Sequence, residues 1–239
     1  MNTHDIDSHL GGAVEPSSRR QIRAVTLDAF GTLVEGDGHI DALVDLVASW
    51  GLQRTRDEIV RAFKAEVAYY RPRSFTGRDQ ESLRRLRLDA TAVFLRALGA
   101  NLDADLRADV RAGLRPEEVM PAFVAALRFR AIDGVLPALD RLAVAGLPLA
   151  VVANWDIGLH EHLARLGMTE RFVAILTSAE AGAEKPDPRI FGLALDRLGV
   201  LPEEAVHVGN EDVDRLGAHA AGLAFEPVPL STLPDRLGL

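Results

Sequence analysis

The hydrophobic positions along the chain follow two patterns, and the change between them falls near residue 130. Between residues 40 and 127, apolar side chains recur every three or four positions, which is the spacing of one helical face. The recurring side chains are Ile40, Leu43, Val44, Val47 and Trp50, then Ile59, Phe63, Val67 and Tyr70, then Leu83, Leu86, Ala90, Val93 and Leu98. The sequence therefore predicts an all-helical segment here.

Short apolar runs outside this segment predict strands that alternate with helices. The strands are expected at residues 22–28, 147–154, 172–178, 205–210 and 223–228, and the helices at 134–145, 157–166, 188–198 and 213–221. Strands alternating with helices of about ten residues are typical of a parallel, doubly wound sheet. The predicted fold class is α/β, with an all-α cap inserted in the sheet domain.

This pattern divides the chain into three parts. The polar residues 1–20 predict a flexible tail, residues 21–35 and 130–239 the sheet core, and residues 36–129 the helical cap. Glycines at 36 and 38 stand near one hinge between core and cap.

Composition narrows the function classes. The net charge of −8 gives no overall attraction to nucleic acid or to an anionic membrane. The chain has no cysteine, which excludes disulfides and thiol catalysis. No apolar run approaches the ~18–20 residues of a membrane span, and the polar start lacks a signal region. We therefore expect a cytoplasmic monomer or homodimer that acts on a small molecule.

Polar side chains follow several of the predicted strands. They are Asp28 and Thr32 after the first strand, Asn154 after the second, Asn210 and Asp214 after a later one, and Lys185 in the loop EKPDPRIF. The carboxyl ends of parallel strands meet at one edge, where sites form. A lysine beside a carboxylate keeps it charged, and the turn at Gly31 and Thr32 is expected to leave backbone N–H groups free for an anion. The set fits a nucleophilic aspartate with electrophilic support.

Each of these residues also has an ordinary structural explanation. An aspartate after a strand is usually a turn or cap residue, and Asn154 and Asp214 could each begin a helix. A single loop lysine such as Lys185 is usually solvated. The functional interpretation depends on the order and spacing of the whole set.

Four segments resemble the motifs of the haloacid dehalogenase superfamily: VTLDAFGTLV, VVANWD, EAGAEKPDPRIF and HVGNEDVDRLGAHAAG. The resemblance covers nearly the whole chain from residue 22. It implies a Rossmann-like core, chemistry at Asp28 through a covalent aspartyl intermediate, support from Lys185, and a cap that carries substrate specificity.

The motifs also depart from those of the family's phosphatases. Phe30 stands where a second acid protonates the leaving group, Ala153 where a hydroxyl contacts the phosphoryl group, and Asn210 where an aspartate binds Mg²⁺. The resemblance implies Mg²⁺ ligands at Asp28, the carbonyl of Phe30, Asn210 and Asp214. Because Mg²⁺ favours anionic oxygen, Asn210 and Phe30 weaken this cofactor prediction.

Two reactions stay open from the motifs. The family's dehalogenases place an aromatic residue at Phe30, since halide leaves without a proton, but they differ at Ala153, Phe191, Gly209 and Glu211. A phosphatase would need another acid, for which His39, Glu35 and Asp37 are candidates. We therefore predict a hydrolase acting on a phosphate ester or a halogenated acid. The alternative is a catalytically inactive or repurposed binding or biosynthetic protein with this fold.

The predicted cap contains YYRPRSFTGR at residues 69–78. A loop between cap helices could close over the site, with Arg71 and Arg73 binding an anionic substrate. The simpler alternative is a solvated turn. In the predicted site, Lys185 holds Asp28, and Asp214 orients Lys185 or a metal-bound water. Thr32 and Asn154 position the anionic group of the substrate, and Phe30 and Ala153 make the pocket more apolar.

Overall fold

The computed structural model describes residues 21–99 and 114–239. The predicted flexible tail at residues 1–20 lies outside the described residues.

A five-stranded parallel sheet forms the centre of the core, in the order β5-β4-β1-β6-β7. Its strands are β1 (Ala24–Leu27), β4 (Leu149–Ala153), β5 (Ala174–Thr177), β6 (Ala205–Gly209) and β7 (Ala224–Pro227). The central strand β1 pairs with β4 on one side and with β6 on the other. The predicted α/β fold class with a parallel sheet is confirmed, and all five strands match predicted ones.

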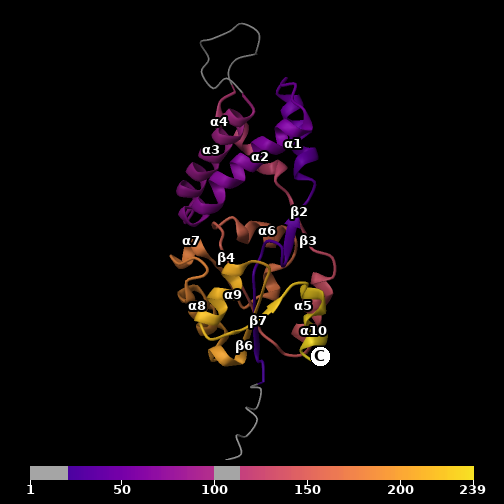
Figure 1. Ribbon diagram of the computed structural model, residues 1–239, viewed down its shortest axis with the longest axis vertical. Coiled ribbons are helices and arrows are strands. Elements are labelled where there is room, and N and C mark those ends of the chain that lie inside the picture. The colour runs from indigo at the N-terminus through magenta and orange to yellow at the C-terminus, as the bar shows by residue number, and fades with distance from the viewer. Residues whose placement is uncertain (1–20, 100–113) are drawn as a thin grey trace, which may run out of the picture.

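Helices cover both faces of the sheet (Figure 1). One face packs against α5 (Val135–Val144), α6 (Leu159–Arg165) and α10 (Leu233–Arg236), and the other against α8 (Pro188–Leu198) and α9 (Asp212–Ala220). Successive side chains of a strand point to opposite faces. Val25 and Leu27 accordingly lie in the first layer and Ala24 in the second. Every residue of β1 is buried, which explains its continuous apolar run.

Within the described residues, four helices form a separate helical unit above the sheet (Figure 1). They are α1 (His39–Ser49), α2 (Arg56–Tyr70), α3 (Gln80–Ala97) and α4 (Pro116–Ala126), with a 3₁₀ helix η1 (Arg71–Thr76) after α2. The unit has its own core, in which Phe94 and Phe123 contact each other with ring centroids 4.7 Å apart. Thr55 and Asp79 begin α2 and α3 with capping boxes.

A two-stranded antiparallel ribbon joins the helical unit to the core. Its strands are β2 (Val34–Gly36) and β3 (Phe129–Ala131), and the cap boundaries predicted at residues 36 and 129 fall within it. The sequence pattern did not predict this ribbon, because three residues are too few to show alternation.

Short elements complete the described structure. They are α7 (Ser178–Ala181), η2 (Thr169–Arg171), η3 (Pro202–Glu204) and η4 (Leu230–Thr232). Among the described residues, no helix is both long and apolar enough to cross a membrane.

Candidate active site

Asp28 stands directly after β1, at the carboxyl edge of the sheet. The helical unit contacts the loop after β4 at the same edge, through Tyr70 and Asp156. The backbone N–H of Asp28 donates to the carbonyl of Val208 at 2.9 Å, which ties this residue to the neighbouring strand β6. Only 8% of the residue is exposed. Its carboxylate oxygen Oδ1 accepts a hydrogen bond from Nζ of Lys185 at 2.5 Å, so the predicted pair is formed.

The Lys185 ammonium bridges two carboxylates. Its Nζ also donates to Oδ1 of Asp214 at 2.6 Å, and only 3% of Lys185 is exposed. The other oxygen of Asp214 accepts the backbone N–H groups of Asn210 at 3.1 Å and Glu211 at 2.9 Å. Asp214, the third residue of α9, therefore both caps the start of that helix and holds the lysine.

The two carboxylates differ in how readily they take up a proton. Burial raises the pKa of Asp28 above its ordinary value of 3.8, although the Lys185 charge opposes this shift. Burial also acts to raise the pKa of Asp214, but a hydrogen bond from His207 and the charge of Lys185 outweigh it and hold that pKa well below the usual range. Asp28 is therefore the carboxylate that protonates first on acidification.

His207 on β6 contacts Asp214 from within the sheet, and the sequence analysis did not predict this contact. Burial lowers the pKa of His207 and keeps its ring neutral. Its Nδ1 contacts the hydroxyl of Thr26 at 2.9 Å and its Nε2 lies 3.4 Å from Oδ1 of Asp214. A neutral ring has one donor, so we assign the proton to Nε2, facing the carboxylate. Its position within a buried strand gave no signal that distinguishes it from a core histidine.

Asn154 contacts the backbone of the Lys185 loop. Its Nδ2 donates to the carbonyl of Lys185 at 3.0 Å, and the N–H of Lys185 donates to its Oδ1 at 2.7 Å. Both ends of the amide are therefore engaged in placing the lysine. Its predicted contact with substrate stays a prediction.

The turn after Asp28 has a different hydrogen-bond pattern from the expected one. The N–H of Gly31 donates to the carbonyl of Val34 at 2.8 Å, and the N–H of Thr32 donates to that of Ala29 at 3.3 Å. The expectation of free N–H groups at these two residues was wrong, because the chain turns back on itself to enter β2. The Thr32 hydroxyl remains close to Asp28, with its Oγ1 3.4 Å from Oδ2.

Aromatic rings line the mouth of the site. The side chain of Phe30 is 48% exposed, and its ring centroid lies 6.4 Å from those of Phe129 and Trp155. His162 contacts Phe129 at 4.6 Å, and burial lowers the pKa of His162 to about 4, so this ring is neutral at neutral pH. Three aromatic rings and a neutral imidazole thus lie together at Phe30. The apolar pocket that Phe30 predicts stays a prediction.

Two of the candidate substitutes for the missing acid are engaged elsewhere. Nε2 of His39 contacts the carbonyl of Arg128, and burial lowers its pKa. Glu35 forms an ion pair with Arg130 across the ribbon. Asp37 is exposed.

The predicted arginine segment lies against the core. Nη2 of Arg71 pairs with Oε1 of Glu211 at 2.6 Å, beside the loop that holds Asp214. Arg73 instead stacks on the ring of Tyr69, with its Cζ 4.2 Å from the centroid, and donates to the carbonyl of that residue. The structure therefore brings Arg71 to the edge of the site and places Arg73, in η1, against Tyr69 of α2.

Tyr70 and Asp156 join the helical unit to the loop after β4. The Tyr70 hydroxyl donates to Oδ2 of Asp156 at 2.6 Å, and the N–H of Ile157 donates to the carbonyl of Gly77 at 3.1 Å. Asp156 is 2% exposed, and burial raises its pKa. The final acid of VVANWD could have signalled this contact, but its partner comes from a helix 86 residues away in sequence.

The predicted Mg²⁺ ligands can be tested against the contacts of each one. Both oxygens of Asp214 are occupied by N–H donors, and Oδ1 of Asp28 is occupied by Lys185. The side-chain amide of Asn210 lies 3.2 Å from Oδ2 of Asp28 and 2.9 Å from the carbonyl of Phe30. Both neighbours are acceptors, so the hydrogen-bond network assigns the NH₂ end to this position. This donor set does not fit Mg²⁺.

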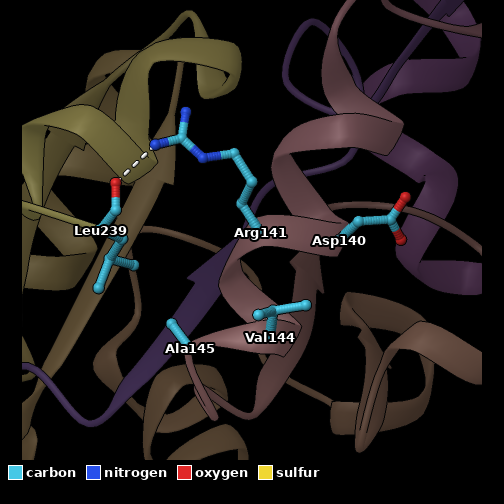
Figure 2. Close-up of a pocket in the computed structure, with 5 residues that line it drawn as sticks. All are labelled: Asp140, Arg141, Val144, Ala145 and Leu239. Carbon is cyan, nitrogen blue, oxygen red and sulfur yellow. Dashed lines mark hydrogen bonds between the residues drawn. The ribbon is translucent and has the colours of Figure 1, made fainter.

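A hollow elsewhere on the core does not belong to this site. It is lined by Asp140, Arg141, Val144, Ala145 and Leu239 (Figure 2). The carboxyl end of α5 leads into the start of β4, so the hollow lies at the opposite edge of the sheet from Asp28. Figure 2 shows that Arg141 spans it and bonds to the carbonyl of Leu239.

Comparison with known proteins finds relatives that match part of the chain. The chain is 38% identical over 108 residues to the haloacid dehalogenase-like hydrolase domain-containing protein 3 of Mus musculus, which covers 45% of this chain and 43% of that protein. It is 45% identical over 91 residues to the glyceraldehyde 3-phosphate phosphatase of Methanopyrus kandleri, covering 37% and 39%. The chain thus spans less than half the length of these curated relatives.

The fold of the chain is also similar to that of an enzyme of known structure. The structure of L-2-haloacid dehalogenase from Xanthobacter autotrophicus superposes with a TM-score of 0.61 at 25% identity, covering 87% of this chain and 78% of that one. The family model for haloacid dehalogenase-like hydrolases matches residues 22–222. Sheet order, motif positions and these matches agree, and the chain belongs to the haloacid dehalogenase-like hydrolases.

Proposed function

We propose that the protein hydrolyses a small anionic substrate through a covalent bond to Asp28, and that the leaving group departs as a stable anion. The observation that carries this proposal is the environment of Asp28. A buried ammonium holds one oxygen, and the exposed ring of Phe30 stands where a related phosphatase has its proton donor. Halide and acidic oxyanions leave without a proton. The proposed substrate is therefore a halogenated acid or a phosphate ester with an acidic leaving group.

The two oxygens of Asp28 have different tasks in this reaction. The short contact with Lys185 fixes Oδ1, whereas the Thr32 hydroxyl lies 3.4 Å from Oδ2. The Asn210 amide also lies 3.2 Å from Oδ2, and both contacts of Oδ2 are longer than the 2.5 Å bond at Oδ1. In this proposal Oδ2 is therefore the oxygen that attacks the substrate carbon or phosphorus. A bond from Oδ2 forms, and the leaving group departs with its electron pair. Water then attacks the intermediate, releases the product and a proton, and restores the carboxylate.

Lys185 keeps the nucleophile ionised, and two further residues position Lys185. Asp214 holds the ammonium from the side of α9, and Asn154 holds the backbone of its loop. A preorganised cation beside developing charge can contribute about 10²–10³ in rate. In this proposal Asp214 and Asn154 are positioning residues.

We infer that the helical unit acts as a cap over the site. Tyr70 contacts the loop after β4, which carries Asn154. Arg71 contacts the loop after β6, whose backbone N–H groups bond Asp214. Substrate contacts made by the cap would thus also affect the positions of the residues that react. If a substrate anion replaces Glu211 as the partner of Arg71, this arginine supplies recognition of the negative group.

The relatives support both substrate classes to different degrees. The Methanopyrus kandleri relative is named a phosphatase and matches 37% of this chain. The Xanthobacter autotrophicus enzyme is named a dehalogenase and supports the fold. The lack of a proton donor at Phe30 favours halide or acidic leaving groups in either class.

The test compares substrates that differ only in the leaving group. We would measure turnover of p-nitrophenyl phosphate, an alkyl phosphate and 2-chloropropionate by wild type and Asp28→Asn. We expect turnover of 2-chloropropionate or the aryl ester, with the alkyl ester slower by about 10²–10⁴ because no residue donates its proton. Asp28→Asn should abolish turnover.

Asp196→Asn is the matched control, since this carboxylate is exposed near the carboxyl end of α8 and is not one of the candidate site residues. It should retain wild-type turnover. Equal rates for aryl and alkyl phosphate would show that the site does supply a proton and would refute the proposal. Turnover that survives in Asp28→Asn would refute the nucleophile. Binding without turnover of any substrate would favour the inactive binding protein.

A further inference from the structure

We propose that the carboxamide of Asn210 takes the place of a metal cation in this site, so that Asp28 is held without Mg²⁺. The resemblance to the family's phosphatases implies a cation between three groups. These are the carboxylate of Asp28, the backbone carbonyl of Phe30 and the acid that those enzymes have at position 210. In this chain the NH₂ group of Asn210 contacts the first two of these at 3.2 Å and 2.9 Å. The proposal depends on the proposed function only for the identity of the site.

The hydrogen-bond chemistry of the amide supports this assignment. Oδ2 of Asp28 and the carbonyl oxygen of Phe30 are both acceptors, and an amide NH₂ has two protons to donate. With the amide oxygen in that position, it would face these two acceptors at 3.2 Å and 2.9 Å, and its donor would be the more distant Thr32 hydroxyl at 3.4 Å. With the nitrogen there, both acceptors are satisfied by one side chain, one of them through a hydrogen bond to a charged group.

The turn is shaped to receive this side chain. Gly31 has φ of 82°, a left-handed conformation that favours glycine. A Cβ atom on Gly31 would lie 2.9 Å from Cγ of Asn210, closer than such atoms approach. The carboxamide therefore packs directly over the glycine backbone, between Phe30 and Thr32.

Gly209, the residue before Asn210, leaves room for the side chain of Asp214. A Cβ atom on Gly209 would lie 2.4 Å from Cγ of Asp214. Asp214 therefore approaches the end of β6 closely, where it bonds the backbone N–H of Asn210 at 3.1 Å. This contact fixes the backbone from which the Asn210 side chain reaches Asp28.

The net charge of the side chains around Asp28 favours a neutral amide over a carboxylate at position 210. Two carboxylates, Asp28 and Asp214, share one ammonium, Lys185, so their sum is a single negative charge. Mg²⁺ favours several anionic oxygens in a near-ideal octahedron. An aspartate at position 210 would add a third carboxylate beside Asp28 and would also remove the NH₂ donor. The difference between a metal-free and a metal-binding site would then be one residue.

The experiment measures Mg²⁺ binding rather than activity. Wild type, Asn210→Asp and Asn210→Ala, each as the full chain, would be unfolded thermally in EDTA and in increasing MgCl₂. We expect no Mg²⁺-dependent change in Tm for wild type or Asn210→Ala. Asn210→Asp should be less stable in EDTA because its carboxylate faces Asp28, and Mg²⁺ at about 100 times Kd should raise its Tm by roughly 5–10 °C.

Two results would overturn the proposal. One is a rise in the Tm of wild type with Mg²⁺ as large as that of Asn210→Asp. The other is an Asn210→Asp protein that folds but gains no Mg²⁺ response, since the amide would then not be what replaces the cation. If Asn210→Asp does not fold, isothermal titration of Mg²⁺ into wild type decides the question, and heat of saturable binding refutes it. Loss of turnover in Asp28→Asn tests the proposed reaction separately.

Discussion

Replacing Lys185 by methionine tests the electrostatic centre of the site. The ammonium lies 2.5 Å from Asp28 and 2.6 Å from Asp214, and Lys185 is 3% exposed. Methionine keeps much of the volume of the lysine stem but removes the only cation bonded to either carboxylate in the described structure. Breaking a buried ion pair by removing one partner costs about 3–5 kcal/mol, because the remaining charge is left unpaired.

The loss should appear as a lower midpoint of thermal or urea unfolding at neutral pH. For a chain of this size, about 3–5 kcal/mol corresponds to roughly 6–20 °C in Tm. Without the cation, the folded-state pKa values of both carboxylates rise above their unfolded values. The folded variant then binds more protons than the unfolded chain, so its stability falls as pH rises. The deficit should therefore be smaller at acid pH than at neutral pH.

Matched variants separate this effect from a simple change in packing. Lys64→Met alters an exposed lysine on α2 and should leave the unfolding midpoint nearly unchanged. Adding Asp214→Asn to Lys185→Met should restore part of the lost stability, because one unpaired charge is removed. A loss below about 1 kcal/mol, the range of an exposed pair, would refute the reasoning that the bridge is buried and coupled.

Three further predictions follow from the ionisable groups. The acid limb of kcat/KM should lie above pH 3.8, since burial raises the pKa of Asp28 and only its ionised form attacks; a limb at or below that value in a pH–rate profile would contradict the assignment. Burial raises the pKa of Glu66 to about 7, so the stability difference between wild type and Glu66→Gln should fall by about 3 kcal/mol as pH rises from 4.5 to 7; the neutral His162 ring contributes an opposite slope that both proteins share. Urea unfolding measures this difference, and the difference between wild type and exposed Glu81→Gln should lack this slope. Tyr70→Phe removes the 2.6 Å hydrogen bond to Asp156 and should lower the free energy of unfolding by about 1–3 kcal/mol, measured by urea unfolding; a change within error would show that the contact is not maintained in solution.

The contacts of the helical unit explain why a mutation there can affect the site. Tyr70 bonds Asp156, two residues after Asn154, and Asn154 in turn places Lys185. A chain of contacts thus runs from α2 through the loop after β4 to the nucleophile. Loss of the Tyr70 hydroxyl should therefore change KM or kcat as well as stability.

Much of the architecture follows from local patterns in the sequence. The apolar strand around Val25, the helix that begins at Asp187-Pro188 and ends before Gly199, and the helical spacing of Leu83, Leu86 and Ala90 all lie within short stretches of chain. Periodicity and capping are properties of neighbouring residues, so the sequence alone is enough to predict them. Two strands of three residues each were missed, because they are too short to show a period.

The candidate site was predicted as a set of positions, since the ends of parallel strands must lie along one edge. Only the tertiary structure decided what each side chain contacts. Lys185 and Asp28 are 157 residues apart, and Tyr70 and Asp156 are 86 apart. The hydrogen bonds of Gly31 and Asn210 likewise depend on angles and distances of a few tenths of an ångström. The sequence by itself determined which chemical groups reach the edge of the sheet, and the packing of distant segments determined which of them are already paired.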